Sequence, residues 1–135
     1  MVALLLMAAF AANVDAQTAA SYDVVVYGGS PSGLAAAIQA ARLGSHVMVV
    51  EPYLHIGGMM SAGLTRTDLG SEKHTGGLCR EFFDRVGEHY DRLGVKRSRL
   101  YDFEPHVAGV IWGGMLHETK RIDVLEYTRL VEVDK

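Results

Sequence analysis

Cysteine and runs of like charge are scarce in this chain. Among 135 residues Cys79 is the single cysteine, so no disulfide can form within the chain. The net charge is −3 and no long run of like charges occurs, which argues against a nucleic-acid partner. Six histidines are present, but no two have the spacing and company of a metal site. A content of 49% hydrophobic and 21% charged residues indicates one globular domain.

Residues 1–20 differ in composition from the rest of the chain. An apolar block, VALLLMAAFAA, is too short to span a bilayer and is followed by small residues spaced for cleavage after Ala16 or Ala20. We therefore expect a signal peptide over residues 1–20, a secreted or periplasmic protein, and no membrane span in the mature chain. No Lys or Arg precedes the block, so the positive segment typical of signal peptides is missing, and a cytoplasmic N-terminal tail is the alternative.

Residues 22–51 have the pattern of a βαβ unit. The run YDVVVY (22–27) predicts a parallel strand buried on both faces, and HVMVVE (46–51) predicts a second strand beside it. Between them, LAAAIQAARLG predicts an alanine-rich helix that ends at Gly44. The expected fold class is α/β, a Rossmann-like FAD- or NAD(P)-binding domain.

The turn between the first strand and the helix has the features of a dinucleotide-binding turn. It comprises Gly28, Gly29, Ser30, Pro31, Ser32 and Gly33. Gly28 and Gly33 occupy the first and third glycine positions of G-x-G-x-x-G, while Ser30 replaces the middle glycine. Serine is a favoured N-cap and proline is favoured at the first helical position, so we expect the helix to begin here with free N–H groups that attract a diphosphate.

Glu51 follows Gly28 by 23 residues, at the carboxyl end of the second predicted strand. A carboxylate at this position accepts hydrogen bonds from both ribose hydroxyls and repels a 2′-phosphate, which disfavours NADP. The structural alternative is a Glu that ends a strand in solvent. The turn and the spacing together favour the ribose-binding role.

The remainder of the chain predicts a long loop, two helices and one or two strands. Residues 52–77 show no sustained period and should form a loop. Residues 78–94 should form an amphipathic helix with Leu78, Phe82, Val86 and Leu93 on one face and with Cys79 buried. Helix is expected from Pro105 onward despite several glycines, and the segment IDVLEYTRLVEVD should be strand, broken near Thr128.

Gly57 and Gly58, six and seven residues beyond Glu51, resemble the glycine doublet of flavoproteins with the glutathione-reductase-like FAD fold. Four blocks, in the order YDVVVYGGSPSGLAAAIQAARLG, VVEPYLHIGGMMSAGLTRTDLG, REFFDRVGEHY and FEPHVA, are together similar to the N-terminal part of exported bacterial FAD-dependent oxidoreductases, some labelled xanthan-lyase-like. NAD-only Rossmann domains lack the doublet as a rule. A plain flexible loop is the alternative interpretation of these glycines.

The resemblance implies FAD as the cofactor and assigns roles to further residues. The doublet lets a loop backbone close over the pyrophosphate and ribityl chain, and a residue near Val131 meets adenine through its backbone. Met59, Met60, Ser61 and Arg66 lie on the loop that runs toward the isoalloxazine ring, and His106 is either a substrate-side or a structural residue. The cofactor-binding residues expected overall are Gly28, Gly29, Ser30, Pro31, Ser32, Gly33, Glu51, Pro52, Gly57, Gly58, Met59 and Val131.

Flavoproteins of this type need several hundred residues, so we expect residues 21–135 to be the N-terminal part of an incomplete FAD-binding domain. The expected function is hydride transfer from a small organic substrate to flavin; export favours a carbohydrate or another extracellular compound. Catalytic residues and oligomeric state are not identifiable from these residues. An NAD-dependent dehydrogenase domain, for which the doublet would be dispensable, and a non-catalytic nucleotide-binding remnant are the alternatives.

Overall fold

The computed structural model describes residues 20–68, 72–96 and 101–134 of the chain. The predicted signal peptide lies outside these residues except for Ala20. The elements follow the order β1 (Val24–Tyr27), α1 (Pro31–Arg42), β2 (Val47–Val50), α2 (Gly58–Ala62), the 3₁₀ turn η1 (Glu72–His74), α3 (Gly77–Arg92), α4 (Pro105–Thr119) and β3 (Ile122–Leu125). None of the helices in the described ranges has the length and apolar character needed to cross a membrane.

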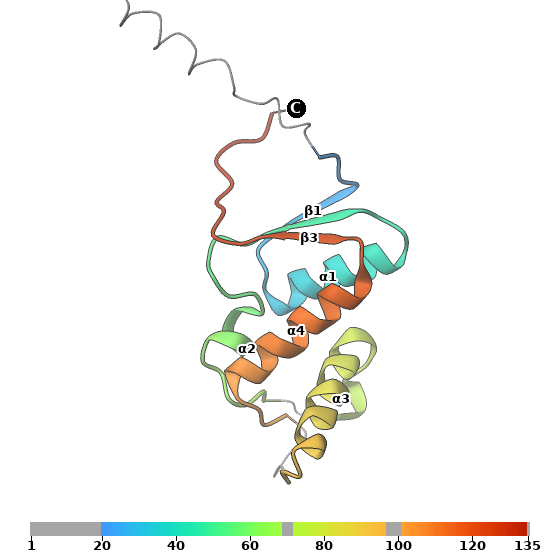
Figure 1. The fold of residues 1–135 in the computed structure, drawn as a ribbon, viewed down its shortest axis with the longest axis vertical. Coiled ribbons are helices and arrows are strands. Elements are labelled where there is room, and N and C mark those ends of the chain that lie inside the picture. Colours follow the sequence, from blue (N-terminus) through green and yellow to red (C-terminus); the bar gives the residue numbers. More distant parts are fainter. Residues whose placement is uncertain (1–19, 69–71, 97–100, 135) are drawn as a thin grey trace, which may run out of the picture.

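Three parallel strands form one sheet in the order β1-β2-β3 (Figure 1). Val24 pairs with Val47, and Val47 pairs in turn with Ile122. β1, α1 and β2 therefore make the predicted βαβ unit, and β3 extends the sheet on the β2 side. The fold is α/β, as predicted, and has the arrangement of a partial Rossmann-like dinucleotide-binding domain.

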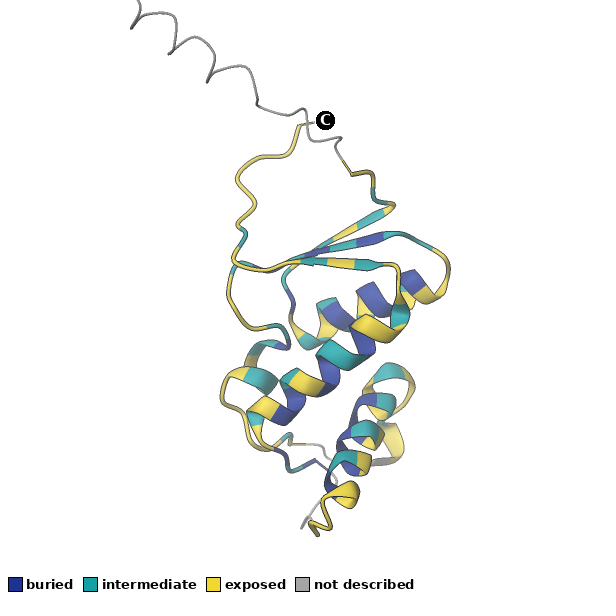
Figure 2. Ribbon diagram, in the orientation of Figure 1, coloured by how far each residue is buried: buried dark blue, intermediate teal, exposed yellow. Residues whose placement is uncertain are grey.

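The helices lie together on one side of the sheet (Figure 1). α1 packs on all three strands, and α4 packs on both α1 and β3, with α3 against α4. α1 presents Leu34, Ala37 and Ile38 to the core, where small alanines let the helix lie close to the strands. An aromatic cluster joins α3 to α4, with Phe82 stacked on Trp112 at a centroid separation of 4.6 Å. Figure 2 shows these buried residues along the facing sides of the helices.

The second face of the sheet is open, which corrects the prediction that the first strand is buried on both faces. Val24 and Val26 pack against the core, but Val25 and Tyr27 are 61% and 50% exposed. Leu125 on β3 is likewise exposed. Successive side chains of a strand point to opposite faces, and none of the described helices covers this second face.

Four further expectations from the sequence were wrong. The predicted loop at 52–77 contains the short helix α2 and the turn η1. Cys79 is exposed because it lies outside the buried face of α3, and Leu93 is exposed because that helix ends at Arg92. No strand forms at residues 128–133, which have no regular secondary structure and are not part of the sheet formed by the described strands. The helix predicted from Pro105 is confirmed, since tertiary packing outweighs its glycines.

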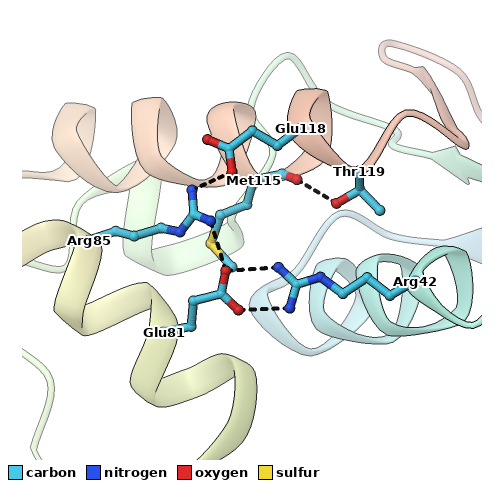
Figure 3. A network of polar contacts seen from close by, with 6 residues as sticks. All are labelled: Arg42, Glu81, Arg85, Met115, Glu118 and Thr119. Atoms are coloured by element: carbon cyan, nitrogen blue, oxygen red, sulfur yellow. Dashed lines mark hydrogen bonds and ion pairs between the residues drawn. The ribbon is translucent and has the colours of Figure 1, made fainter.

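An ion-pair network connects three helices (Figure 3). The Arg42 guanidinium on α1 makes two hydrogen bonds, of 2.7 and 2.8 Å, to the carboxylate of Glu81 on α3. Glu81 also accepts from Arg85 at 2.9 Å, and Arg85 reaches Glu118 on α4 at 2.8 Å. The hydrogen-bonded Arg42 lowers the pKa of Glu81, partial burial opposes this shift, and Arg85 adds to it.

Candidate dinucleotide-binding site

The turn between β1 and α1 has the conformation expected from its sequence. Gly28 has φ +101°, a conformation that suits glycine. Ser30 is the N-cap of α1, as predicted; its Oγ accepts a hydrogen bond of 3.3 Å from Gly33 N–H, and Pro31 is the first helical residue. Ser30 has φ −64° and ψ 162°, which any residue can adopt. The backbone therefore does not require glycine at this middle position.

Gly33 lets the first helix approach the first strand. A Cβ at this position would lie 2.2 Å from the carbonyl oxygen of Gly28 and 3.2 Å from Val26 Cγ1. A Cβ cannot lie 2.2 Å from an oxygen, and neither this Cβ nor the Gly28 carbonyl oxygen could move away without a shift of the backbone. Gly33 therefore allows the close packing of helix on strand for which the third glycine of this motif is suited.

Glu51 is buried at the carboxyl end of β2, with 6% of its surface exposed. One carboxylate oxygen accepts a hydrogen bond of 2.6 Å from Gly29 N–H, and the other accepts one of 2.8 Å from Tyr53 N–H. The alternative of a glutamate that ends a strand in solvent is therefore wrong. Each carboxylate oxygen has two acceptor positions, so both can still accept from a further hydroxyl.

The glycine doublet packs directly against the turn. Gly57 N–H donates to the carbonyl oxygen of Gly29 at 2.6 Å. Gly57 has φ +95°, and a Cβ on it would lie 2.8 Å from Ser61 Oγ and 2.9 Å from Trp112 Cδ1. Gly58 has φ +52°, with its Cβ position 3.3 Å from Pro31 Cδ. The doublet is therefore closely packed between the turn before α1 and the side chains of α2 and α4, which argues against a plain flexible loop.

The segment after β3 returns to the end of β2. Thr128 N–H donates to the carbonyl oxygen of Glu51 at 3.0 Å, and Tyr127 N–H donates to that of Tyr53 at 3.2 Å. Val131 lies further along this segment and is 93% exposed. The hydrogen bonds therefore bring Tyr127 and Thr128, rather than Val131, to the end of β2, and the strand expected around Val131 does not form.

The residues predicted on the flavin-side loop divide into two groups. Met60 is partly buried against the core, whereas Met59 is 78% exposed. Ser61 Oγ donates to the carbonyl oxygens of Ile56 and Gly58 and so holds α2 together. Arg66 is paired with Asp102 at 2.9 Å, which ties this loop to the segment before α4.

A solvent-open groove and the buried Trp112 lie near the doublet; His106, in the groove, was considered as a site residue from the sequence, whereas Trp112 was not. His55, His106 and Glu126 are among the residues lining an open groove of about 800 Å³. His106 is exposed on the first turn of α4. Trp112 lies against Gly57 of the doublet. The sequence contained no indication of this contact beyond the fact that Trp112 is the single tryptophan and lies in an apolar predicted helix. Among the described residues, no group of three or more His, Cys, Asp and Glu is arranged to hold a metal ion.

The turn and its surroundings fit the diphosphate and ribose of a dinucleotide. Backbone N–H groups in the first turn of a helix, such as that of Ser32, have no acceptor within the helix and attract anions. The first turn of α1 contains no acidic residue that would oppose a diphosphate. The carboxylate of Glu51 lies beside the same turn, where it accepts from donors and repels an additional phosphate.

Comparison with known proteins agrees with this geometry. The family model described as FAD dependent oxidoreductase matches residues 23–135. No curated protein matches the chain.

Several solved structures are similar at low identity. They include a THI4 protein of Thermovibrio ammonificans (21% identity, TM-score 0.47, 92% of this chain and 45% of that one) and an oxidized steroid monooxygenase bound to NADP (21%, 0.49, 78% and 19%). A p-nitrophenol 4-monooxygenase from Pseudomonas putida is also similar (15%, 0.49, 83% and 33%). The chain spans less than half the length of each of these structures.

The family model covers the whole βαβ unit, the glycine doublet and the return to Glu51. The chain therefore belongs to the FAD-dependent oxidoreductase family, whose cofactor is FAD.

Proposed function

We propose that residues 21–135 are the N-terminal part of the FAD-binding domain of an oxidoreductase that moves a hydride from a small organic substrate to flavin. One observation carries the proposal. Gly29 donates its N–H to the Glu51 carboxylate and accepts at its carbonyl oxygen from Gly57 N–H. This single residue therefore joins the dinucleotide turn, the strand-end carboxylate and the glycine doublet.

Each part of this arrangement takes one part of FAD in the proposal. The pyrophosphate lies against the first turn of α1, where Ser30 can add a hydroxyl donor. Glu51 accepts from the ribose hydroxyls, and the loop of Gly57, Gly58 and Met59 closes over the pyrophosphate and ribityl chain. Pro52 and the backbone near Val131 border the adenine. The full set of proposed cofactor-binding residues is Gly28, Gly29, Ser30, Pro31, Ser32, Gly33, Glu51, Pro52, Gly57, Gly58, Met59 and Val131.

When bound, FAD supplies the hydride-accepting chemistry, and the protein supplies binding, orientation and electrostatics. We assign no catalytic base to the described residues. Removal of a signal peptide at residues 1–20 and a secreted or periplasmic location are parts of the same proposal, based on the apolar N-terminal block. The glutathione-reductase-like and xanthan-lyase-like resemblances are further proposals that rest on similarity alone, and the proposed export leaves a carbohydrate or another extracellular organic compound as the substrate.

The proposal is tested by the non-denatured intact mass of the protein isolated from its natural source. A chain of several hundred residues that begins near position 17 or 21 and carries FAD is the expected result. A mass near that of residues 21–135 with nothing bound would contradict the oxidoreductase and favour a nucleotide-binding remnant.

The choice between FAD and NAD requires a direct titration of the cofactor-free protein with each dinucleotide. Substituting the doublet does not separate the two cofactors. Gly57 and Gly58 have positive φ and lie against Ser61, Trp112 and Pro31, so larger residues would disturb the turn with either ligand. Binding of FAD without binding of NAD is expected. The reverse order of affinities would establish the dehydrogenase alternative.

A further inference from the structure

A second pocket, of about 260 Å³, lies among the helices beside the dinucleotide turn. Its walls come from the first turns of α1, from α2, α3 and α4, and from the loop at Thr67. The lining residues are Pro31, Ser32, Ala35, Met60, Thr67, Cys79, Phe82, Phe83 and Trp112. Since Pro31 and Ser32 also belong to the turn, a molecule in this pocket would adjoin the bound cofactor.

Two polar atoms on pocket-lining residues have no hydrogen-bond partner among the described residues. They are Trp112 Nε1 and Thr67 Oγ1, and both are buried. Trp112 is 3% exposed, and its ring is held by stacking on Phe82. A buried N–H without an acceptor costs about 1–3 kcal/mol, so an acceptor that reaches it would be bound favourably.

The chemical character of the walls restricts what the pocket can bind. The lining is almost wholly apolar, and the Cys79 thiol is its only ionisable group. Partial burial raises the pKa of that thiol, so it stays neutral near pH 7. A sugar would leave several hydroxyls without partners here, and an anion would find no cation. An apolar ring with one acceptor satisfies both the walls and the indole N–H.

We propose that this pocket binds the substrate, and that the substrate is a small, uncharged, ring-containing molecule with one hydrogen-bond acceptor. The proposal deepens the proposed function and rests on it, because the pocket adjoins the turn assigned to FAD. Trp112 Nε1 donates to the acceptor, while Phe82, Phe83 and Met60 contact the ring. This ligand class replaces the carbohydrate expected from export.

Cys79 lies at the exposed side of the pocket and reports its occupancy. The full native protein is alkylated with iodoacetamide at mildly alkaline pH, and the rate is read by mass spectrometry on the tryptic peptide HTGGLCR. Acetophenone at millimolar concentration should slow alkylation about threefold or more. Ethylbenzene, which keeps the ring and a two-carbon side chain but lacks the acceptor, should protect less, and glucose should not protect.

Three variants make the assignment specific. Ala35→Leu fills the pocket from α1 and should abolish protection, whereas Ala36→Leu, on an exposed position of the same helix, should leave it unchanged. Trp112→Phe removes the N–H, keeps an aromatic ring and should weaken acetophenone binding about 2- to 10-fold. It should leave ethylbenzene binding unchanged, which distinguishes a lost hydrogen bond from a general structural change.

The proposal is overturned if acetophenone gives no protection, if glucose protects equally, or if both leucine variants behave alike. It is also overturned if FAD alone slows alkylation as much as acetophenone does, because the pocket would then belong to the cofactor. FAD content is read in the same samples from flavin absorbance. Protection by acetophenone in a protein that cannot bind FAD would overturn the proposed function and leave the pocket assignment standing.

Discussion

Gly29 and Glu51 are joined by a 2.6 Å hydrogen bond from the backbone N–H to a carboxylate oxygen that is buried at the end of β2. They are 22 positions apart in the chain, with the whole of α1 between them. The bond fixes the carboxylate beside the dinucleotide turn before any ligand arrives. Such preorganisation lowers the entropic cost of binding.

Glu51→Gln should affect both stability and FAD affinity. The carboxylate accepts from Gly29 and Tyr53 on its two oxygens, and an amide has one oxygen, so one backbone N–H would face an NH₂ group. We expect the free energy of unfolding to fall by about 1–3 kcal/mol in urea titrations. FAD should bind about tenfold more weakly, through loss of charge-assisted bonds to ribose.

Glu126→Gln is the matched control, because Glu126 follows β3 at the same edge of the sheet and is exposed. Glu126→Gln should leave the free energy of unfolding and the free energy of FAD binding within about 0.5 kcal/mol of the native values. Equal effects of the two substitutions would contradict a specific role for Glu51.

Ser30→Ala and Ser30→Gly should have different effects on stability. The Ser30 hydroxyl caps α1 at Gly33 N–H, so alanine should lower the unfolding free energy by about 1 kcal/mol. Glycine should cost only a few tenths of a kcal/mol in urea titrations. Ser32→Ala serves as the control for stability, and a larger loss there than at Ser30 would refute the capping role.

Gly33→Ala and Gly114→Ala should change stability in opposite directions. Alanine at position 33 would lie 2.2 Å from the Gly28 carbonyl oxygen, and we expect a loss of about 2 kcal/mol or more. Gly114 lies within α4, and nothing is within 4 Å of its Cβ position. Alanine there should stabilise the protein by about 0.5–1 kcal/mol. Thermal unfolding of the two variants checks both signs, and a stabilised Gly33 variant would be inconsistent with the packing described.

Glu81→Gln should destabilise the protein at neutral pH by about 0.5–1 kcal/mol, since the pair with Arg42 is partly exposed. The pKa of Glu81 is lowered in the folded state, chiefly by the hydrogen bond from Arg42. The stabilisation is therefore present above the carboxyl's ordinary titration range and is lost as pH falls through the lowered pKa.

The difference between the native protein and the Glu81→Gln variant in urea should accordingly shrink from about pH 7 to about pH 3. Glu88→Gln, at an exposed position of the same helix, provides the comparison. If the difference in unfolding free energy between the native protein and the Glu81→Gln variant stayed the same in acid, the ion pair would be excluded as its cause.

Local sequence pattern predicted much of the fold. Strands at 24–27 and 47–50 follow from β-branched runs of strand length, and the start of α1 follows from the Ser-Pro pair. α4 was also predicted, because Pro105 opens a long apolar segment. These features depend on neighbouring residues alone, so a single sequence is sufficient to detect them.

Other features depend on contacts between segments far apart in the chain. α2 is one short turn of helix, which has little stability of its own and is held by α4 and by Ser61. Cys79 is exposed because the packing of α3 against α4 decides which of the side chains of α3 are covered, and Leu93 is exposed because α3 ends at Arg92. The open face of β1 likewise depends on where every helix packs.

The sequence by itself determined the βαβ unit, the glycines of the turn and the family, because these are encoded in order and spacing along the chain. Only the tertiary structure decided that Gly29 joins Glu51 to Gly57, and that the indole N–H of Trp112, a residue lining an apolar pocket, has no acceptor among the described residues. Hydrogen bonds and cavities between distant segments arise when helices pack, and their geometry is set by side-chain volumes on several elements at once.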